Sequence, residues 1–302
     1  MSTFATPPAS RAAGPEVRSV PTRAGPMEVA LLGDGPAALA LHGAMGGWDQ
    51  GVLLARSMGV AGFRWIAPSR PGFLGTPRAL GRTPEEQADR YAEALDALGV
   101  DAAAVAAVSG GGPSAIAFAL RHPRRCRALV LVSACTVGRI DVRLPLAWHL
   151  MKLAARVPPL VSALRRRTAR DPEEAARRSI PDPALRARTV GDPEAGPLLA
   201  ALQASTLHRM ALRIPGTEDD IATSRAALGA DLERLSVPVL AVHGTADRAA
   251  PFAQAEAVAA RVPGAELLAI AGGEHVALFT HLAEVRARVG PFLRSHAPVR
   301  LA

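Results

Sequence analysis

The sequence contains little of what several classes of protein depend on. Its 302 residues include two cysteines, Cys126 and Cys135, and a single lysine, Lys152. Two cysteines provide neither a disulfide framework nor the spacing of zinc ligands, so we expect a reducing compartment and two core thiols. Seven Phe, three Trp and one Tyr supply few side chains for the aromatic and basic surface typical of nucleic-acid binding. We therefore expect no nucleic-acid partner and no bound metal.

Long apolar runs are missing as well. No stretch reaches the roughly 18 residues of a membrane-spanning helix. The first residues mix Pro, Ala, Ser and Arg and hold no apolar segment of the kind found in secretory signal peptides. We therefore expect a soluble, cytoplasmic protein without an integral membrane segment.

The positive charge of the chain comes almost entirely from arginine. The formal net charge is +8, and its densest cluster comprises Arg165, Arg166, Arg167, Arg170, Arg177 and Arg178. A solvated helix face is the plain interpretation of such a cluster, and contact with a membrane surface or an anionic ligand is the more specific one. The sequence leaves both open, and it does not indicate an oligomeric state.

Short apolar runs alternate with longer amphipathic segments, which is the pattern of an α/β protein. Strands are predicted near residues 27–32, 37–42, 62–67, 102–108, 127–134, 237–243 and 265–271. Most of the later runs are apolar almost without interruption, as strands are when helices cover both faces of a mostly parallel sheet. The first two runs, joined by Gly33-Asp34-Gly35-Pro36, predict an antiparallel hairpin at one edge.

One helix start is marked in detail. The segment Thr83-Pro84-Glu85-Glu86 offers an N-cap hydroxyl, a proline at the first helical position and two acids in the first turn. These features predict a helix that ends near Leu98.

Two segments depart from the alternation. Residues 1–24 are rich in Pro, Ser, Ala and Arg and are predicted to be a loose lead-in. Residues 139–235 are helical and interrupted by prolines, and their first part carries a wide apolar stripe. We interpret this segment as a helical cap inserted into a core domain of residues 25–138 and 236–302. An ordinary core helix and a membrane-surface helix are the alternatives for the stripe.

The most distinctive motif is the small-residue turn from Ser109 to Ala115, which follows a predicted strand. Its glycines fit the dinucleotide fingerprint G-x-G-x-x-A, but the next strand ends without the acid that would hold a ribose. A phosphate-binding Walker loop needs a lysine that this turn lacks, and a plain flexible loop is the other alternative. The remaining interpretation is a nucleophile elbow, in which a sharp strand-to-helix turn forces Ser109 to positive φ and brings Ala107 close to Gly111.

Two further motifs supply this serine with chemical partners. Asp247 follows the predicted strand at 237–243, and His275 follows the last predicted strand. Because the carboxyl ends of parallel strands meet at one edge of the sheet, we expect Ser109, Asp247 and His275 to converge there. A base beside a serine, with a carboxylate behind the base, activates the hydroxyl as a nucleophile.

With these motifs the sequence resembles the α/β-hydrolase superfamily, specifically its cap-bearing members that act on small molecules. Leu41 to Gly47 look like the His-Gly loop of that family, Pro68 to Thr76 are similar to its D-x-P-G-x-G-x-S loop with Ser69 in place of the Asp, and Gly244 to Pro251 match its acid loop. The resemblance covers about residues 27–138 and 236–295. It implies the α/β-hydrolase fold, a mostly parallel twisted sheet flanked by helices, with an inserted helical cap.

The resemblance also implies roles for single residues. Ser109 is the expected nucleophile, His275 the general base and then acid, and Asp247 the carboxylate that holds the imidazole tautomer. The backbone N–H groups of Ala44 and Gly110 are the expected oxyanion hole. No cofactor motif is found, so a small-molecule substrate is the only ligand expected.

Other residues near the motifs have plainer interpretations. Met45 is the less favoured second oxyanion donor. His42 and His243, each at a strand end before a glycine, are expected to satisfy loop backbone, and Asp219 and Asp220 to mark a helix start. The remaining acids near the motifs are Asp49 and Glu274, expected to be solvated, and Asp141, an alternative acid that lies too far past its strand.

Acyl transfer to water is the simplest chemistry for such a triad. A small hydrophobic carboxylic ester is the expected substrate because the predicted cap is apolar. Thioesters, lactones, carbon–carbon bonds of dienoic ketones and prolyl peptides are alternatives for the same triad. A non-catalytic protein of this fold that binds a small ligand or a partner is the alternative from another class.

Overall fold

The computed structural model describes residues 14–140, 146–226, 229 and 231–297. Its centre is an eight-stranded sheet with the order β1-β2-β4-β3-β5-β6-β7-β8. The strands are β1 Glu16–Thr22, β2 Gly25–Leu32, β3 Ala37–Leu41, β4 Arg64–Pro68, β5 Ala103–Val108, β6 Cys126–Val132, β7 Val239–Gly244 and β8 Glu266–Ile270. Neighbouring strands from β4 across to β8 are parallel, whereas β2 is antiparallel to both of its neighbours. The sheet is thus mostly parallel, as the apolar runs predict.

The helices fall between most of these strands. The α-helices are α1 Trp48–Met58, α2 Pro84–Ala97, α3 Gly112–Arg121, α4 Leu146–Ala154, α5 Pro158–Arg170, α6 Pro172–Ala176, α7 Pro183–Gly191, α8 Ala195–Leu207, α9 Ile214–Arg225, α10 Ala253–Arg261, α11 Ala277–Thr280 and α12 Leu282–His296. Short 3₁₀ helices are Arg78–Leu80, Ser109–Gly111, Pro123–Arg125, Met210–Leu212 and Leu232–Arg234. In the part of the chain that the structure describes, none of these helices combines the length and apolar character needed to cross a bilayer.

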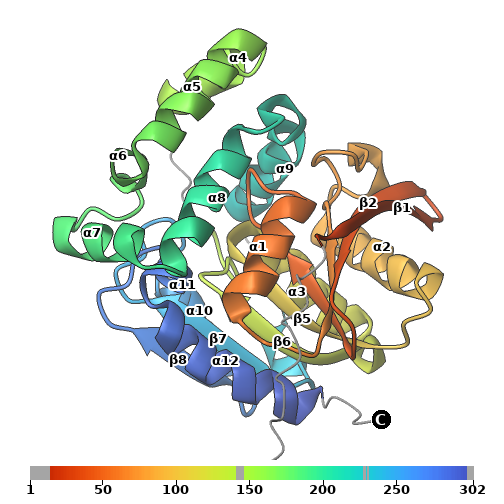
Figure 1. The fold of residues 1–302 in the computed structure, drawn as a ribbon. Coiled ribbons are helices and arrows are strands. Elements are labelled where there is room, and N and C mark those ends of the chain that lie inside the picture. Colours follow the sequence, from red (N-terminus) through yellow and green to blue (C-terminus); the bar gives the residue numbers. More distant parts are fainter. Residues whose placement is uncertain (1–13, 141–145, 227–228, 230, 298–302) are drawn as a thin grey trace, which may run out of the picture.

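Helices cover both faces of the sheet (Figure 1). On one face α2, α3 and α10 pack against strand residues such as Leu39 and Val105. On the other face α1 and α12 pack against the strand residues whose side chains point the opposite way, such as Ala38 and Ala104. Successive strand residues point to opposite faces, so strands covered on both sides must be apolar throughout. The predicted α/β fold class is confirmed.

The predicted hairpin of the first two apolar runs is wrong. β4 lies between β2 and β3 and pairs with both of them. The connection that was expected to be a tight turn instead packs on the residues that lead into β4. A Cβ at Gly35 would lie 2.2 Å from the carbonyl oxygen of Gly62, and one at Gly33 would lie 2.6 Å from that of Phe63. The glycines therefore permit a close approach to another strand rather than a two-strand turn.

The predicted loose lead-in over residues 1–24 does not hold for Glu16–Thr22. This segment is β1, which pairs with β2 along its whole length. β1 forms the sheet edge, and Val20 is its only fully buried side chain. An edge strand tolerates proline and polar side chains, as at Pro21, so its composition resembles that of a loop. Residues 1–13 of the predicted lead-in lie outside the described residues.

A helical insertion separates β6 from β7, at the place where the sequence predicts a cap. It comprises α4 to α9. In Figure 1 α4 and α5 form an arm, residues 146–170, that extends beyond the other helices, whereas α8 and α9 lie close to the sheet domain. The insertion therefore has one part that packs on the rest of the molecule and one part that projects from it.

The start of α2 follows the sequence prediction. The Thr83 hydroxyl accepts a hydrogen bond from the backbone N–H of Glu86, and the Glu86 carboxylate accepts one from the N–H of Thr83. This capping box satisfies two N–H groups that the first turn leaves without helical partners. The helix ends at Ala97, one residue before the predicted end.

We expect Thr83→Ala to lower the free energy of unfolding by about 1 kcal/mol, because the N-cap acceptor is lost. Urea denaturation followed by circular dichroism measures this change. Thr83→Ser keeps the hydroxyl and is the matched control, so it should lose much less. Equal losses in the two variants would show that the methyl group, and not the cap, is what matters.

Candidate active site

The turn after β5 holds Ser109 in a left-handed conformation. Its φ is 52°, a value that residues with a side chain rarely adopt. The chain turns at once into the 3₁₀ helix Ser109–Gly111 and then into α3. This is the strand-to-helix turn of a nucleophile elbow, so the backbone geometry predicted for Ser109 is confirmed.

Gly111, two residues after the serine, is constrained by a different element from the one expected. A Cβ at Gly111 would lie 2.7 Å from the carbonyl oxygen of His42 and 2.8 Å from that of Leu41. The end of β3, rather than Ala107, therefore supplies the nearest contacts. Gly43 is equally confined, because a Cβ there would lie 3.0 Å from the Cβ of Ser109. The elbow and the loop after β3 are packed backbone against backbone.

The three residues predicted to converge are hydrogen-bonded to one another. His275 Nε2 lies 3.0 Å from Ser109 Oγ, and His275 Nδ1 lies 2.8 Å from Asp247 Oδ2. They follow β5, β7 and β8, whose carboxyl ends share one edge of the sheet. The Asp247 side chain is fully buried, whereas that of His275 is 30% exposed. The geometry is that of a serine, a base that reaches it and a carboxylate that orients the base.

The Asp247 carboxylate is held by several donors. Its Oδ1 accepts hydrogen bonds from the backbone N–H groups of Ala249 and Ala250, at 2.8 and 3.0 Å. Burial alone would raise its pKa, but hydrogen bonds from His243, His275 and the Ala250 amide hold the pKa well below the usual range. An ionised Asp247 accepts a hydrogen bond from the Nδ1–H of His275, so in the neutral imidazole Nε2 is unprotonated and faces Ser109.

Two other histidines are structural, as predicted. His42 is fully buried; its Nε2 accepts a hydrogen bond from the Arg70 amide, so its Nδ1 donates to the carbonyl of Gly43. Burial, with the charge of Arg70, holds the pKa of His42 well below its ordinary value. His243 is also buried and donates from Nε2 to the carbonyl of Ala250. His42 thus fixes the loop beside the Ser109 turn, and His243 fixes the loop that carries Asp247.

The amides of Ala44 and Gly110 lie close together beside Ser109. A Cβ at Gly110 would lie 3.5 Å from the Ala44 nitrogen. Among the hydrogen bonds of the described residues there is none from either of these two N–H groups. The Met45 N–H, in contrast, donates to the Thr217 hydroxyl at 2.8 Å. The geometry thus favours Ala44 over Met45 as the second donor to an anion at Ser109.

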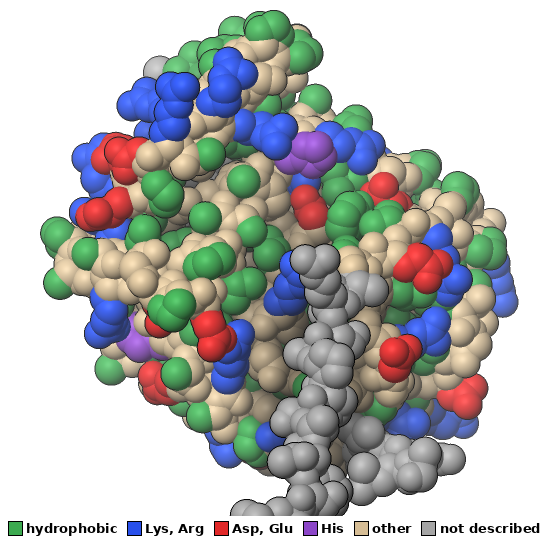
Figure 2. Space-filling view, in the orientation of Figure 1, with side chains coloured by type: hydrophobic (Ala, Val, Ile, Leu, Met, Phe, Trp, Pro, Cys, Tyr) green, Lys and Arg blue, Asp and Glu red, His purple; other side chains and the backbone are tan. Residues whose placement is uncertain are grey.

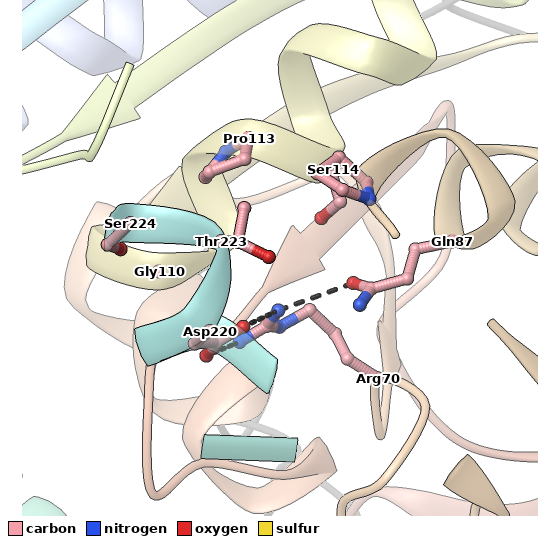
Figure 3. A pocket seen from close by; sticks show the side chains of 9 residues that line it. Arg70, Gln87, Gly110, Pro113, Ser114, Asp220, Thr223 and Ser224 are labelled. Carbon is pink, nitrogen blue, oxygen red and sulfur yellow. Dashed lines mark hydrogen bonds and ion pairs between the residues drawn. The ribbon is translucent and has the colours of Figure 1, made fainter. Parts of the chain in front are cut away.

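A buried ion pair beside the elbow escaped the sequence analysis. Arg70 is 1% exposed, and its guanidinium contacts both carboxylate oxygens of Asp220 at 2.9 and 2.5 Å. Figure 3 shows this pair with Gln87, whose amide oxygen lies 3.3 Å from the same guanidinium. Arg70 Nε donates to the carbonyl of His42 at 2.9 Å. One arginine thus connects the His42 loop to α2 and to α9.

Asp220 also approaches the elbow directly, because a Cβ at Gly110 would lie 2.8 Å from its Oδ2. The prediction that Asp219 and Asp220 mark a helix start is wrong, since α9 begins at Ile214 and both carboxylates are buried. Asp219 pairs with the guanidinium of Arg78 at 2.6 Å. The side chains that interact are far apart in the sequence, so no local pattern indicates them.

A second buried arginine acts on the same loop. Arg213 is fully buried and pairs with both oxygens of Asp49, at 3.1 and 2.6 Å. Its guanidinium also lies 3.3 Å from the carbonyl oxygen of Met45, a residue with φ of 55°. The expectation that Asp49 is solvated is therefore wrong. Two ion pairs between the insertion and the core thus hold the loop that carries the Ala44 amide.

The remaining candidates add no competing nucleophile or acid. Cys126 and Cys135 are buried, and burial raises the pKa of both thiols to about 12, so both are core thiols as expected. Among the described residues, no side chain or amide is hydrogen-bonded to the Glu274 carboxylate, which is only partly buried. Asp141, the alternative acid, lies outside the described residues.

We expect Asp220→Asn to destabilise the protein by about 3 kcal/mol or more, because the guanidinium of Arg70 would stay buried without its counter-ion. Asp96→Asn is the matched control: Asp96 pairs with Arg125 at 2.7 Å but is 65% exposed, so its loss should cost about 1 kcal/mol or less. Urea denaturation of both variants measures the difference. Similar costs would mean that the Arg70 charge is satisfied without Asp220.

Known proteins resemble both the sequence and the fold. A family model described as the alpha/beta hydrolase fold matches residues 36–282. The solved structure of an alpha/beta hydrolase fold protein from Nakamurella multipartita is 34% identical, with a TM-score of 0.81 over 93% of this chain and 99% of that one. The partial match to YcgS, an uncharacterised hydrolase of Bacillus subtilis, is 32% identical and spans 42% of that protein.

Two further relatives match most of the chain. The pimeloyl-[acyl-carrier protein] methyl ester esterase of Aromatoleum aromaticum is 32% identical, over 73% of this chain and 84% of that protein. The 2-hydroxymuconate semialdehyde hydrolase of Pseudomonas putida is 28% identical, over 78% of this chain and 79% of that protein. These relatives are hydrolases by name, and one is an esterase. The chain therefore belongs to the alpha/beta hydrolase superfamily, as its motifs predict.

Proposed function

We propose that this protein is a serine hydrolase that cleaves a small, hydrophobic carboxylic ester through an acyl-enzyme. The observation that carries the proposal is the continuous hydrogen-bonded chain from Ser109 through His275 to the buried, ionised Asp247. The two unengaged amides beside Ser109 support the same chemistry. The esterase among the relatives supports an ester as the bond that is cleaved.

The first half of the reaction makes the acyl-enzyme. Ser109 Oγ attacks the ester carbonyl carbon while His275 Nε2 takes the hydroxyl proton. Asp247 stabilises the imidazolium that forms and keeps its Nδ1 proton in place. Collapse of the tetrahedral intermediate breaks the bond to the alkoxide, which leaves with the proton from His275 Nε2.

The second half returns the enzyme to its starting state. His275 Nε2 takes a proton from a water molecule, and the resulting hydroxide attacks the acyl carbonyl. The second tetrahedral intermediate releases the carboxylic acid, and Ser109 regains its proton from His275. The ester bond and one water molecule are consumed, and no group is oxidised or reduced. No cofactor enters this sequence.

The amides of Ala44 and Gly110 would stabilise both intermediates. Each intermediate carries a negative oxygen, and preorganised N–H donors oppose that charge more effectively in a protein site than in water. Gly110 also lies at the start of the 3₁₀ and α3 segment, whose first amides point toward the carboxyl edge of the sheet. The Arg70 and Arg213 ion pairs would keep the Ala44 amide in position.

We further propose that residues 139–235 serve as the cap of this site. Support comes from α9, because Thr217 bonds to the Met45 amide and Asp220 packs against Gly110. The insertion thus contacts one proposed oxyanion donor, Gly110, and the residue that follows the other, Ala44. Carbon–carbon bonds of dienoic ketones, thioesters, lactones and prolyl peptides remain alternative substrates of the same triad. A non-catalytic binding role remains the alternative from another class.

We expect a fluorophosphonate probe to label Ser109, because the reagent reacts with activated serines. Peptide mass spectrometry of the labelled protein locates the adduct. Ser109→Ala should abolish labelling and lower the hydrolysis of p-nitrophenyl esters by at least about 10⁴-fold, whereas Ser162→Ala, a substitution at an exposed serine, should change neither. A folded wild-type protein that resists the probe would favour the binding role.

We expect Asp247→Asn to lower kcat by about 10⁴-fold, because an amide would favour the wrong tautomer of His275. Steady-state kinetics with the ester that the wild-type protein hydrolyses fastest measures the change. Asp231→Asn, at an exposed carboxylate, is the control and should keep full activity. Unchanged kcat in Asp247→Asn would separate the carboxylate from the chemistry. A parallel assay of thioesters, lactones and a dienoic ketone distinguishes the bond types.

A further inference from the structure

The arm of α4 and α5 concentrates the exposed apolar side chains of the described surface. Among the described residues, large hydrophobic side chains are exposed at Val17, Leu150, Leu153, Val157, Leu160, Leu164 and Leu212. Five of these seven lie between residues 150 and 164, and Leu150 and Leu153 are 58% and 61% exposed. Scattered apolar residues are ordinary on a surface, but a contiguous group usually marks an interaction site.

The helix α5 is unusual because none of its 13 residues is buried. A surface helix of a globular protein normally turns an apolar stripe toward the core. In α5 the stripe of Leu160 and Leu164 stays 45% and 36% exposed. The packing of the chain on itself therefore does not account for the apolar residues of the arm.

The same helix carries four exposed arginines, Arg165, Arg166, Arg167 and Arg170. Among the described residues, no carboxylate forms an ion pair with any of the four, although Lys152 and Arg177 nearby are paired with Glu218 and Glu174. With 3.6 residues per turn, Arg167 and Arg170 lie on one flank of the Leu160 and Leu164 stripe, whereas Arg165 lies farther round the helix, near His208. Arginines beside an apolar stripe can lay their stems along the apolar surface and hold their charged groups at its polar edge.

Figure 2 shows hydrophobic side chains over the end of the molecule where Figure 1 places the arm, with Lys and Arg side chains gathered next to them. We propose that the arm is a docking surface for an anionic lipid bilayer. The leucines and Val157 would enter the interface, and the four arginines would bind the phosphate groups of the lipids, as amphipathic basic helices do. This inference does not depend on the proposed hydrolase activity.

The charge of the arm favours a lipid surface over a second copy of this chain. A two-fold contact between arms would bring the unpaired arginines of both copies together without carboxylates to neutralise them. A protein partner is also less suited to the residues present. Strongly contributing residues of protein interfaces are enriched in Trp, Tyr and Arg and poor in Leu and Val, whereas the exposed apolar residues of the arm are leucines and Val157, and Trp148 is buried.

Co-sedimentation with vesicles tests the proposal, with Ser109→Ala protein to prevent hydrolysis of the lipids. We expect at least about tenfold more protein in the pellet with phosphatidylglycerol and phosphatidylcholine vesicles than with phosphatidylcholine alone, at about 0.05 M salt. Binding should fall at about 0.5 M salt, because ions screen the arginine charge. Equal recovery in the supernatant with and without anionic vesicles at low salt would overturn the proposal.

Variants assign the binding to the arm. Leu150→Ser with Leu153→Ser, and separately Arg167→Ser with Arg170→Ser, should each lower anionic vesicle binding at least about fivefold, with unchanged melting temperatures because these side chains are exposed. Val17→Ser with Leu212→Ser is the control, since both residues are exposed elsewhere on the surface. An equal loss in the control would overturn the assignment.

Two further outcomes would replace the lipid by another partner. Light scattering that shows a dimer of the wild-type protein and a monomer of the Leu150→Ser, Leu153→Ser variant would identify the arm as a contact between copies. Binding of polyglutamate without binding of anionic vesicles would identify it as a site for an acidic protein. Either result would overturn the lipid proposal.

Discussion

The backbone of Ser109 is the constraint on which the rest of the site depends. A residue held at φ of 52° stores strain of about 1–3 kcal/mol, so its surroundings must prevent it from relaxing. Those surroundings leave no space: a Cβ at Gly112 would lie 2.4 Å from the carbonyl oxygen of Cys135, and Gly111 meets the end of β3 at similar range. The close packing of β3, β5 and β6 with the turn keeps the hydroxyl directed toward His275.

Three loops of the site are held in place by different combinations of interactions. The Ser109 turn is held by steric contact between backbones. The Asp247 loop is held by its own carboxylate, which accepts hydrogen bonds from two amides and two imidazoles. The His42 loop combines close packing at Gly43 and a hydrogen bond from the His42 imidazole with charge from Arg70 and Arg213. Ion pairing is thus added to sterics and hydrogen bonding on this side of the site.

The sequence pattern alone predicts those features of the fold and the site that depend on residues close together in the chain. Buried parallel strands are apolar throughout, a capped helix begins with an acceptor and acids, and an elbow needs small residues around its serine, so β5, α2 and Ser109 are visible in the sequence. The position of β4 between β2 and β3 cannot be predicted from the sequence in this way, because strand order follows from the packing of the whole sheet. β1 was missed because an edge strand with one buried side chain lacks the alternation that identifies strands.

The least predictable feature, the pair of Arg70 and Asp220, says most about how the insertion relates to the core. Its partners are 150 residues apart, and either one alone would be a buried charge. The half of the insertion that contains α9 is therefore not exchangeable on its own. In a chimera with the insertion of another relative, Arg70 and Asp49 would lose their ion-pair partners. They would keep them only if that insertion carried an acid and an arginine at the positions of Asp220 and Arg213. The arm is tied to α9 by the partly exposed pair of Lys152 and Glu218, which constrains it less. A chimera could therefore exchange the arm at a smaller cost in stability than α9, which must change together with the His42 loop.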